Sequence, residues 1–594
     1  MEATHEVTNQ PPPLTGYDVF GADAALVEAF GRHAPAAGRA ELRALGRLAG
    51  SAEAQRWARE ADANGPVLRT HDRYGHRVDE VDFHPSWHRL MATAVEHGLH
   101  AAPWASPEPG AHAVRAAKFL VWSQLEAAHL CPVSMTYAAV PALRTDASVA
   151  AGWEPLLTSP AYDPGLRPPA AKAGALAGMA MTEKQGGSDV RANTTRAEPA
   201  GDGWYRLTGH KWFCSAPMND VFLVLAQAPG GLTCFVLPRV LDDGGRNAVR
   251  LQRLKDKLGN RANASAEIEL DGALAQRLGD EGRGVATIIE MVAATRLDCV
   301  LGSAALLRRS VAEATWHAAH RSAFGARLAD SELMRAVLAD LAVESEAATA
   351  LAMRLAASVD AADDPHERAL RRIGLPLAKY WVCKRTPGAV AEALECLGGN
   401  GYVEESAMPR LYREAPLNSI WEGAGNIQAL DLLRVLAREP DAVAAWRAEV
   451  EAAKGHDRRL DDALAGVTAT LMAGDRGGLR APAGRAGASH PDGGRRGGDV
   501  GDGRVSAAEA GGAGVGVRTA AAGVDGAGAA GQARVLAGQM AVLLQASLLV
   551  RFAPPAVADA FCASRLDARH GVYGALPAGL DTAAIVDRAT PGAP

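Results

Sequence analysis

The spacing of the apolar residues changes twice along this chain of 594 residues. Up to about residue 175, and again from about residue 284, apolar residues recur every three to four positions, which is typical of amphipathic helices. Between these regions, short β-branched and aromatic runs such as 204–207, 221–225 and 233–237 are bounded by glycine-rich turns, which predicts strands. These strands follow one another without intervening helices, so we expect antiparallel pairing. The pattern predicts an α+β fold, mainly α, with a central antiparallel β domain between two helical regions.

The same changes divide the chain into four predicted domains. Residues 1–175 form an N-terminal helical domain, 176–283 the β domain, 284–440 a C-terminal helical bundle and 441–594 an extra C-terminal region. Within the last region, 474–531 holds 19 glycines in 58 residues and only isolated apolar side chains. Such a stretch buries too little apolar surface to offset the entropy of ordering the chain. We interpret it as a disordered segment, an unusual insertion or a locally shifted reading frame.

Composition excludes several classes of protein. Apolar residues make up 48% and charged residues 22%, as in an ordinary soluble protein. No uninterrupted apolar run reaches the roughly 18 residues that favour a membrane span, and the first twenty residues lack the apolar core of a secretory signal. The formal net charge of -6 excludes a whole-molecule field that attracts nucleic acid and leaves only a local basic patch for that purpose.

Cysteine, histidine and glycine patterns give no metal or dinucleotide motif. The seven cysteines are scattered and form no C-x-x-C pair, which indicates a reducing, cytoplasmic environment without a disulfide framework. His317 and His320 are three residues apart on a predicted helix, but a third ligand is missing, so no metal is expected. The sequence Gly526-Ala-Gly-Ala-Ala-Gly531 matches G-x-G-x-x-G only within the glycine-rich stretch and follows no strand.

Three segments carry residues suited to chemistry. The loop Met179–Asp189 offers hydroxyl and backbone donors for a polar ring system; the alternative is a hydrophilic turn. The segment Gly209–Ser215 places an indole beside small residues, where a strand with a core tryptophan is the alternative. In Ile420–Asn426, Glu422 follows Trp421, and apolar surroundings would raise the pKa of this carboxyl toward that of a general base. The alternative is a glutamate that only favours the helix dipole.

Together these segments resemble the acyl-CoA dehydrogenase family over residues 1–440. Five motifs carry the resemblance. Residues 181–189 are similar to the family's flavin loop, 257–261 to its K-x-G-x-R turn and 321–325 to its R-x-x-F-G segment. Residues 397–402 are similar to its L-G-G-x-G-Y loop and 421–428 to its [YW]-E-G-x-x-x-I-Q segment. Longer strings, at 179–198, 209–215, 254–265 and 409–426, resemble the AidB subfamily, which is induced in the bacterial adaptive response to DNA alkylation.

The resemblance implies FAD as cofactor, a four-helix C-terminal domain and an extra helical region after it. The residues that it assigns to FAD are Met179, Met181, Thr182, Gly187, Ser188, Phe213, Cys214, Ser215, Ile420, Trp421 and Asn426. It further implies that Arg321, Gly398 and Gly399 reach the FAD of a neighbouring subunit in a homotetramer. The family's R-x-x-F-G-x-P-[IL]-x-x-x-Q pattern is broken by Arg327 and Glu332, so contacts to the adenine end are not implied for this segment.

The resemblance also implies the reaction. Glu422 would take the α-proton of an acyl-CoA-like thioester while a β-hydride passes to FAD. Arg296 would tune Glu422, with a structural salt bridge as the alternative role of Arg296.

Three functions follow as hypotheses: acyl-CoA desaturation, protection of DNA from alkylation with double-stranded DNA bound through the C-terminal region, or a vestigial flavoprotein. A metabolic acyl-CoA dehydrogenase without a DNA role is the alternative to the AidB type. The near-neutral balance of 457–534, with ten arginines and nine acidic residues, gives little electrostatic drive toward DNA.

Overall fold

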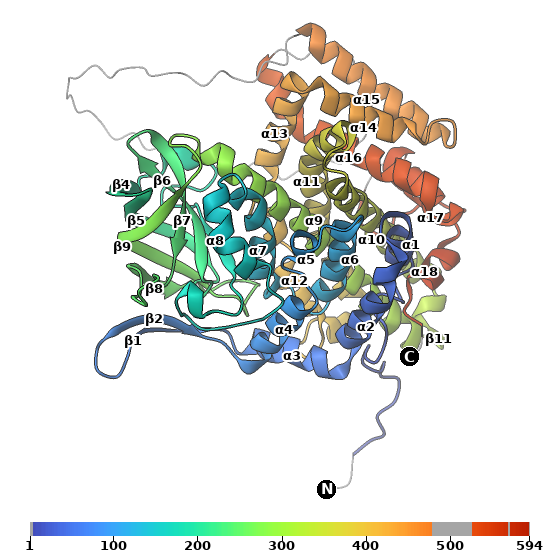
Figure 1. Ribbon diagram of the computed structural model, residues 1–594. Coiled ribbons are helices and arrows are strands. Elements are labelled where there is room, and N and C mark those ends of the chain that lie inside the picture. The colour runs from blue at the N-terminus through green and yellow to red at the C-terminus, as the bar shows by residue number, and fades with distance from the viewer. Residues whose placement is uncertain (1–3, 478–525, 568–570, 593–594) are drawn as a thin grey trace, which may run out of the picture.

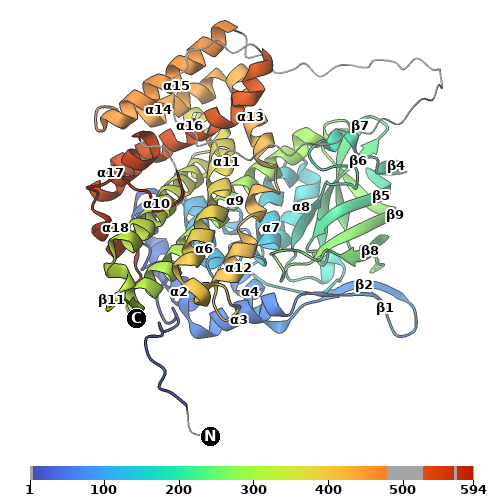
Figure 2. The same cartoon turned by 180° about the vertical axis from the view of Figure 1, so that it is seen from behind.

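The computed structural model describes residues 4–477, 526–567 and 571–592. In Figure 1 the β domain lies at one side of the molecule, and helices from both ends of the sequence pack together beside it. The opposite view shows the same division, with α7 and α8 between the sheet and the other helices (Figure 2). The predicted fold class, mainly α with a central β domain, is confirmed.

The N-terminal region is helical apart from one hairpin. Its helices are α1 (Ala24–His33), α2 (Arg39–Gly50), α3 (Ala52–Ala63), α4 (Pro85–Glu96), α5 (Ala102–Ala105), α6 (Ala111–Ser123), α7 (Leu130–Leu143) and α8 (Ala147–Leu157). The hairpin, β1 (Val67–His71) and β2 (Arg77–Asp82), was not predicted. Its strands are half-exposed and rich in charge, with Arg69 bridging Asp82 across the pair at 2.6 Å, so they lack the apolar run from which a strand is recognised.

The sheet is mostly antiparallel, as predicted, with one difference. Its strands are β3 (Ala177–Ala180), β4 (Arg196–Gly201), β5 (Trp204–Ser215), β6 (Val221–Ala228), β7 (Gly231–Pro238), β8 (Val249–Leu254) and β9 (Ser265–Leu278). They follow the order β3-β6-β4-β5-β9-β7, β8 pairs with β9, and β6 also pairs with β7. Strand β3 runs parallel to β6, and β4 shares one parallel pair with β6. The chain between β3 and β6 passes through the Met179–Asp189 loop and the β4–β5 hairpin, and this long excursion permits a parallel return.

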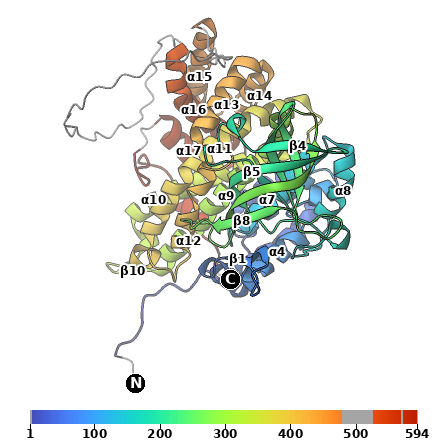
Figure 3. The ribbon, with the colours of Figure 1, turned by 90° about the vertical axis from the view of Figure 1, so that its left-hand side faces the viewer.

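The second helical region begins with three long helices, α9 (Gly284–His320), α10 (Glu332–Asp360) and α11 (Pro365–Cys396). They pack against one another through apolar positions at helical spacing, among them Leu341, Ala348, Ala352 and Leu355 of α10, all buried in the largest core cluster. A short helix α12 (Met408–Glu414) and α13 (Gly425–Arg438) follow. Helix α9 contacts β6 and β7 and lies close to the sheet in Figure 3, so part of α9 can contribute to a site at the sheet.

Five further helices form the C-terminal region: α14 (Pro440–Glu451), α15 (Arg458–Gly477), α16 (Gly526–Phe552), α17 (Pro555–Cys562) and α18 (Thr582–Ala589). Residues 531–552 of α16 are long and apolar enough to cross a membrane, yet 67% of that stretch's most apolar window is buried inside the protein. Helix α16 packs against α10, α11 and α13 to α15, and Trp446 Nε1 donates to the Met540 carbonyl at 3.2 Å, as in a core helix.

The glycine-rich stretch is only partly described. Helix α15 extends to Gly477 and α16 begins at Gly526, so both ends of the stretch are helical, which differs from the interpretation of 474–531 as a disordered segment. Alanines, the strongest helix formers, accompany the glycines at 526–531 and account for the difference. The G-x-G-x-x-G match therefore lies in a helix rather than in a strand-to-helix turn. Residues 478–525 lie outside the described residues.

Candidate functional site

Glu422 lies in the short segment between a 3₁₀ turn (Leu417–Ser419) and α13, with its carboxyl group turned toward α9. Its Oε2 accepts a hydrogen bond of 2.7 Å from Thr295 Oγ1. Burial raises the pKa of the Glu422 carboxyl, while the Thr295 hydrogen bond and the charges of Lys379 and Arg296 act in the opposite direction. The balance is a carboxylate more basic than an exposed glutamate, which is what proton abstraction near neutral pH requires.

The backbone of this segment is strained and is held from three sides. Glu422 has φ of 57° and Gly423 has φ of 94°, in the left-handed region that costs a non-glycine residue roughly 1–3 kcal/mol. Lys379 Nζ donates to the Gly423 carbonyl at 3.0 Å, and Gln428 Nε2 donates to the same carbonyl at 2.8 Å. Arg296 Nε donates to the Glu422 carbonyl at 3.2 Å. These contacts fix the direction of the carboxyl group.

Arg296 acts on the backbone rather than on the carboxyl group of Glu422. Its Nη1 forms an ion pair with Asp431 of α13 at 2.9 Å, which is the structural salt bridge weighed as its alternative role. The same guanidinium bonds the Glu422 carbonyl, and its charge lowers the pKa of Glu422. Arg296 is therefore a positioning residue with an electrostatic effect on the base.

The loop Met179–Asp189 is anchored beneath by a buried carboxylate. Glu183 Oε1 accepts from Lys211 Nζ at 2.8 Å and from Thr195 Oγ1 at 2.6 Å, and its Oε2 accepts from the Thr194 amide at 2.7 Å. The Trp212 amide donates to the Thr182 carbonyl at 2.8 Å. The exposed side of the loop is thereby held with Gly187 and Ser188 facing solvent.

At Gly187 the loop backbone approaches Thr182 closely. A Cβ at position 187 would lie 2.6 Å from Thr182 Oγ1, so a side chain there would displace the hydroxyl. The absence of a side chain keeps the Thr182 hydroxyl and the loop amides together on one surface.

The end of β5 divides its three predicted cofactor residues between two faces. Phe213 is 49% exposed and Ser215 is half-buried, while Cys214 is buried in the core cluster of the sheet. Since successive side chains of a strand point to opposite faces, Cys214 cannot share the face of its neighbours. The Cys214 side chain therefore lies in the core of the sheet, and its assignment to the cofactor stays a prediction.

The structure brings Glu422 to the loop and to Ser215. Trp421, Met179 and Met181 pack against the same apolar cluster, which joins α7, the sheet and α9. The buried Cys131 thiol of α7 lies near both Ser215 and Glu422. Burial raises the pKa of this thiol to about 12, the Ser215 hydroxyl lowers that pKa, and the Glu422 charge raises it. Three segments that are far apart in sequence thus lie around one apolar cluster.

Other predicted residues lie apart from this site. Ile420 and Asn426 are exposed beside it. Arg321 follows the last residue of α9, 25 residues after Arg296, which places it roughly 38 Å away along the helix. Gly398 and Gly399, beyond the end of α11, are also exposed. A single chain therefore does not bring these three residues to Glu422.

Lys379 of α11, which donates to carbonyl groups on either side of Glu422, was not predicted from the sequence. Lys379 is 1% exposed and also donates to the Asn418 carbonyl at 2.9 Å. The available signal was its position among the apolar residues of α11, such as Leu375 and Val382, where a charged side chain requires a partner. Nothing in the local sequence shows that the partner is a loop more than 35 residues away.

A cavity opens beside the site along α9; we call it the α9 cavity. Its volume is about 570 Å³, and Arg191, Gln227, Arg283, Val285 and Ile289 are among its lining residues. Ile289 is six residues before Thr295, roughly 9 Å along α9. Within the described residues, the guanidinium groups of Arg191 and Arg283 make no ion pair or hydrogen bond, so two cations face this cavity uncompensated.

These residues fit a flavin better than a metal ion. The loop offers the hydroxyls of Thr182 and Ser188 and its own amides, and Phe213 and Ile420 offer exposed apolar faces next to it. A flat ring system with a polar edge matches this set of donors and faces. Among residues 4–477, 526–567 and 571–592, no group of three or more histidine, cysteine or acidic side chains is placed to hold a metal ion.

Comparison with known families agrees with this assignment along the chain. Residues 9–164 match the N-terminal domain of the adaptive response protein AidB, 178–273 the middle domain of acyl-CoA dehydrogenases and 282–437 their C-terminal domain. The chain is 48% identical to AidB of Escherichia coli (strain K12) over 463 residues, which cover 78% of this chain and 86% of that protein. It is 32% identical over 431 residues to acyl-CoA dehydrogenase family member 11 of Caenorhabditis elegans, covering 70% and 69% of the two chains.

Solved structures show the same architecture. The structure of Caenorhabditis elegans ACDH-11 in complex with C11-CoA superposes with a TM-score of 0.79 at 26% identity and covers 94% of this chain and 93% of that chain. The apo form of Bd2924 superposes with a TM-score of 0.77 at 25% identity and covers 92% and 99%. The chain belongs to the acyl-CoA dehydrogenase family, in its AidB-like branch, and is an oxidoreductase with FAD as its cofactor.

Proposed function

We propose that the chain desaturates an acyl-CoA thioester, with Glu422 as the base that removes the α-proton. The observation that carries the proposal is the Glu422 carboxyl group, which burial makes more basic and whose neighbour Trp421 packs against the same apolar cluster as Met179 and Met181 of the flavin loop. When bound, FAD accepts the hydride that leaves the β-carbon, so the substrate loses one proton and one hydride and gains a double bond.

Each residue of the Glu422 segment has a part in this step. Glu422 in its ionised form receives the α-proton, and the Thr295 hydroxyl holds one carboxylate oxygen in place. Lys379 and Gln428 hold the Gly423 carbonyl, and Arg296 holds the Glu422 carbonyl, so the carboxyl group is oriented before the substrate arrives. Trp421, next to the base, packs against the apolar cluster, and Glu422 itself is half-buried, so part of the base is shielded from water.

The α9 cavity is the proposed binding site for the CoA end of the substrate. Its two uncompensated guanidinium groups, of Arg191 and Arg283, suit phosphate groups, and Val285 and Ile289 supply apolar surface beside them. The acyl-CoA complex of the ACDH-11 structure supports an acyl-CoA substrate for this branch of the family.

Replacing Thr295 with valine tests the hydrogen bond at the base. The Thr295 hydroxyl stabilises the ionised carboxyl and so lowers the pKa of Glu422. Its loss will raise that pKa, and flavin reduction by acyl-CoA will then fall about tenfold at mildly acid pH and recover as the pH rises. The measurement is the pH dependence of anaerobic flavin reduction. Thr295→Ser retains the donor and should restore the parent profile; identical profiles for the valine and serine variants would contradict the assigned role.

We infer a second role, association with double-stranded DNA in protection against alkylation. The support is the AidB-type N-terminal domain and the 48% identity with Escherichia coli AidB. The described C-terminal region presents exposed cations, such as Lys454 in the turn after α14 and Arg458 at the start of α15, although Arg458 already pairs with Asp462 at 3.5 Å. Such a surface gives weak and strongly salt-dependent binding.

A gel-shift titration with duplex DNA tests this role. We expect a shift at low salt that disappears as salt rises, and that weakens in Lys454→Glu combined with Arg458→Glu. Arg56→Glu, an exposed change on α3, is the matched control and should leave the shift intact. No shift at low salt would contradict the DNA role and would favour a metabolic acyl-CoA dehydrogenase.

We propose a homotetramer as the assembly. Phe324, at the tip of the hairpin after α9, and Tyr402, after α11, are exposed apolar side chains close in sequence to Arg321 and to Gly398. Exposed apolar groups of this kind are typical of subunit contacts. Light scattering on the FAD-bound protein, with Phe324→Asp as the disrupting variant, measures the assembly.

A further inference from the structure

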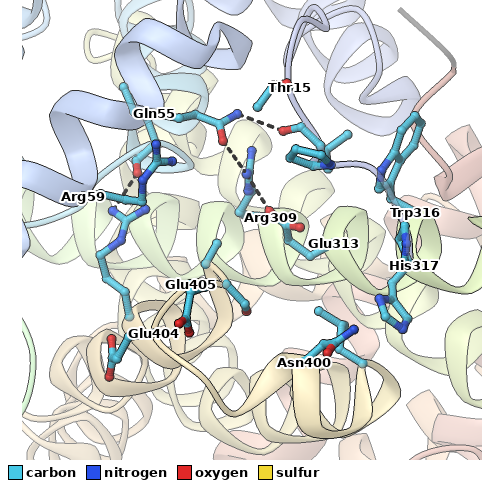
Figure 4. Close-up of a pocket in the computed structure, with 18 of the residues that line it drawn as sticks. Thr15, Gln55, Arg59, Arg309, Glu313, Trp316, His317, Asn400, Glu404 and Glu405 are labelled. Carbon is cyan, nitrogen blue, oxygen red and sulfur yellow. Dashed lines mark hydrogen bonds and ion pairs between the residues drawn. The ribbon is translucent and has the colours of Figure 1, made fainter. Parts of the chain in front are cut away.

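The N-terminal arm, here residues 9–14, runs along a cavity of about 550 Å³ that α3, α9 and the 397–402 loop also line. Figure 4 shows Gln55 of α3 across this cavity from Trp316 of α9, with Asn400 of the loop on the side of Trp316. The arm therefore lies between elements that are hundreds of residues away from it in the sequence, and its contacts show which of them it holds.

The arm is bound through its carbonyl groups. Three consecutive prolines, 11–13, lack amide donors and restrict the backbone, so this stretch can be held by acceptors at a small cost in entropy. Trp316 Nε1 donates to the Pro12 carbonyl at 2.8 Å, and Gln55 Nε2 donates to the Leu14 carbonyl at 2.9 Å. The Leu14 side chain is buried in the core. These contacts fix the course of the arm and the position of the two residues that precede the prolines.

Asn9 binds the hairpin after α9 as a neighbouring strand would. The hairpin consists of β10 (Ser322–Ala323) and β11 (Ala326–Arg327). Asn9 Nδ2 donates to the Ser322 carbonyl at 2.8 Å, and the Ser322 amide donates to Asn9 Oδ1 at 2.8 Å. The backbone of Asn9 has φ of 56°, which asparagine tolerates better than most residues. Two strands of two residues are marginally stable by themselves, so this amide clamp stabilises the hairpin.

Arg321, the residue before the hairpin, is held by the same part of the arm. Its Nη1 donates to the Asn9 carbonyl. Burial lowers the pKa of His317, and the charge of Arg321 lowers it further, so the guanidinium group lies near the last turn of α9. Within the part of the chain that the structure describes, Arg321 makes no ion pair. An uncompensated guanidinium group whose direction is fixed by a carbonyl is suited to phosphate oxygens.

The next residue of the arm reaches the 397–402 loop. Asn400 Nδ2 donates to Gln10 Oε1 at 3.4 Å. Asn9 and Gln10 therefore connect the two segments that the family resemblance assigns to the FAD of a neighbouring subunit. The family pattern has proline at the position of Arg327, where it would restrict the hairpin backbone, so the arm supplies a restraint that the hairpin itself lacks.

We propose that the arm is a strap that positions Arg321 and the 397–402 loop for the FAD of a neighbouring subunit, with Asn9 as the positioning residue for Arg321. The inference rests on the proposed homotetramer and on the assignment of Arg321 to FAD. Asn9 acts through Arg321, because it fixes the hairpin and the guanidinium group before FAD binds, and binding groups that are already ordered cost less to engage. Loss of the clamp lowers the affinity for FAD and leaves the flavin loop and the Glu422 segment in place.

Release of FAD from the full-length holoenzyme on dilution tests the strap, with flavin fluorescence as the measure of the dissociation constant. Asn9→Gly removes the amide clamp and permits the same left-handed backbone, so we expect the dissociation constant for FAD to rise about fivefold. Arg321→Gln should raise it roughly tenfold. Asn64→Gly, which removes an exposed asparagine that donates to the Glu60 carbonyl at 2.8 Å, is the matched control and should release FAD as the parent does.

The double variant Asn9→Gly with Arg321→Gln separates a positioning role from a structural one. If Asn9 acts through Arg321, the double variant should release FAD like Arg321→Gln alone, whereas a general weakening of the fold would add to that effect. Light scattering should give the parent assembly for Asn9→Gly.

The proposal is overturned if Asn9→Gly releases FAD like the parent, if the two effects add in the double variant, or if Asn9→Gly changes the assembly. Parent-like release by Arg321→Gln would reject the assignment of Arg321 to FAD and the strap with it. An effect of Arg321→Gln without an effect of Asn9→Gly would reject the strap alone.

Discussion

Glu422→Gln is expected to reduce the rate of anaerobic flavin reduction by acyl-CoA about 10² to 10⁴-fold, the usual contribution of a general base. Glutamine has almost the same shape and keeps an oxygen for the Thr295 hydroxyl, so the fold and the cofactor should be retained. What is lost is the ability to receive the α-proton. Stopped-flow absorbance of the flavin measures the rate.

The control for this variant is Glu290→Gln, an exposed glutamate on the same α9 helix that carries Thr295. It removes an equal charge from the same region and should reduce its flavin at the parent rate. If Glu422→Gln were as active as this control, another group would be the base, and the raised pKa of Glu422 would reflect packing alone.

Glu183→Ala is expected to lower the free energy of unfolding by about 3–5 kcal/mol and to weaken FAD binding. Glu183 and Lys211 are both 0% exposed and lie 2.8 Å apart, so the variant would leave a buried ammonium without its counter-ion. Four hydrogen bonds from Thr194 and Thr195 to this carboxylate would also be lost, and with them the anchor of the flavin loop. Denaturant unfolding and flavin retention on gel filtration measure the two effects.

The ionisation of Glu183 gives the same prediction a pH dependence. Burial opposes ionisation, but the bonds from Lys211, Thr194 and Thr195 prevail and hold the pKa of Glu183 well below its usual 4.5. The stabilisation is therefore complete above pH 4.5 and is lost as the pH falls further. Glu198→Ala, an exposed change on β4, is the control and should alter neither quantity. Parent-like stability of Glu183→Ala would show that the loop does not depend on this buried pair.

Periodicity was sufficient to predict the elements with strong apolar patterns. The long helices α9 to α11 and the strands β5, β6 and β7 lie where the spacing of apolar residues placed them. The hairpin β1–β2 escaped because charge pairs rather than apolar contacts hold it. The parallel β3–β6 pair escaped because strand direction is decided by the path of the chain between them, which local sequence does not record.

The site was predictable to the extent that it lies in contiguous motifs. The segments around Thr182, Ser215 and Glu422 were each recognised from residue type and resemblance, and the structure brings them together. The sequence does not show which side chain at the end of β5 faces the loop, because the alternation of the strand is interrupted by an irregularity between Lys211 and Cys214. Lys379 was missed because its partners are carbonyl groups of a distant loop, and a contact of that kind is set by tertiary packing.

Mixing the FAD-bound protein anaerobically with saturated acyl-CoA of short, medium and long chain tests the desaturation directly. The predicted result is bleaching of the oxidised flavin by at least one of these chain lengths, with the matching 2-enoyl-CoA formed in equal amount. An oxidised flavin spectrum that stays unchanged with every chain length, together with recovery of the intact acyl-CoA, would contradict the assignment of Glu422 as a base in dehydrogenation.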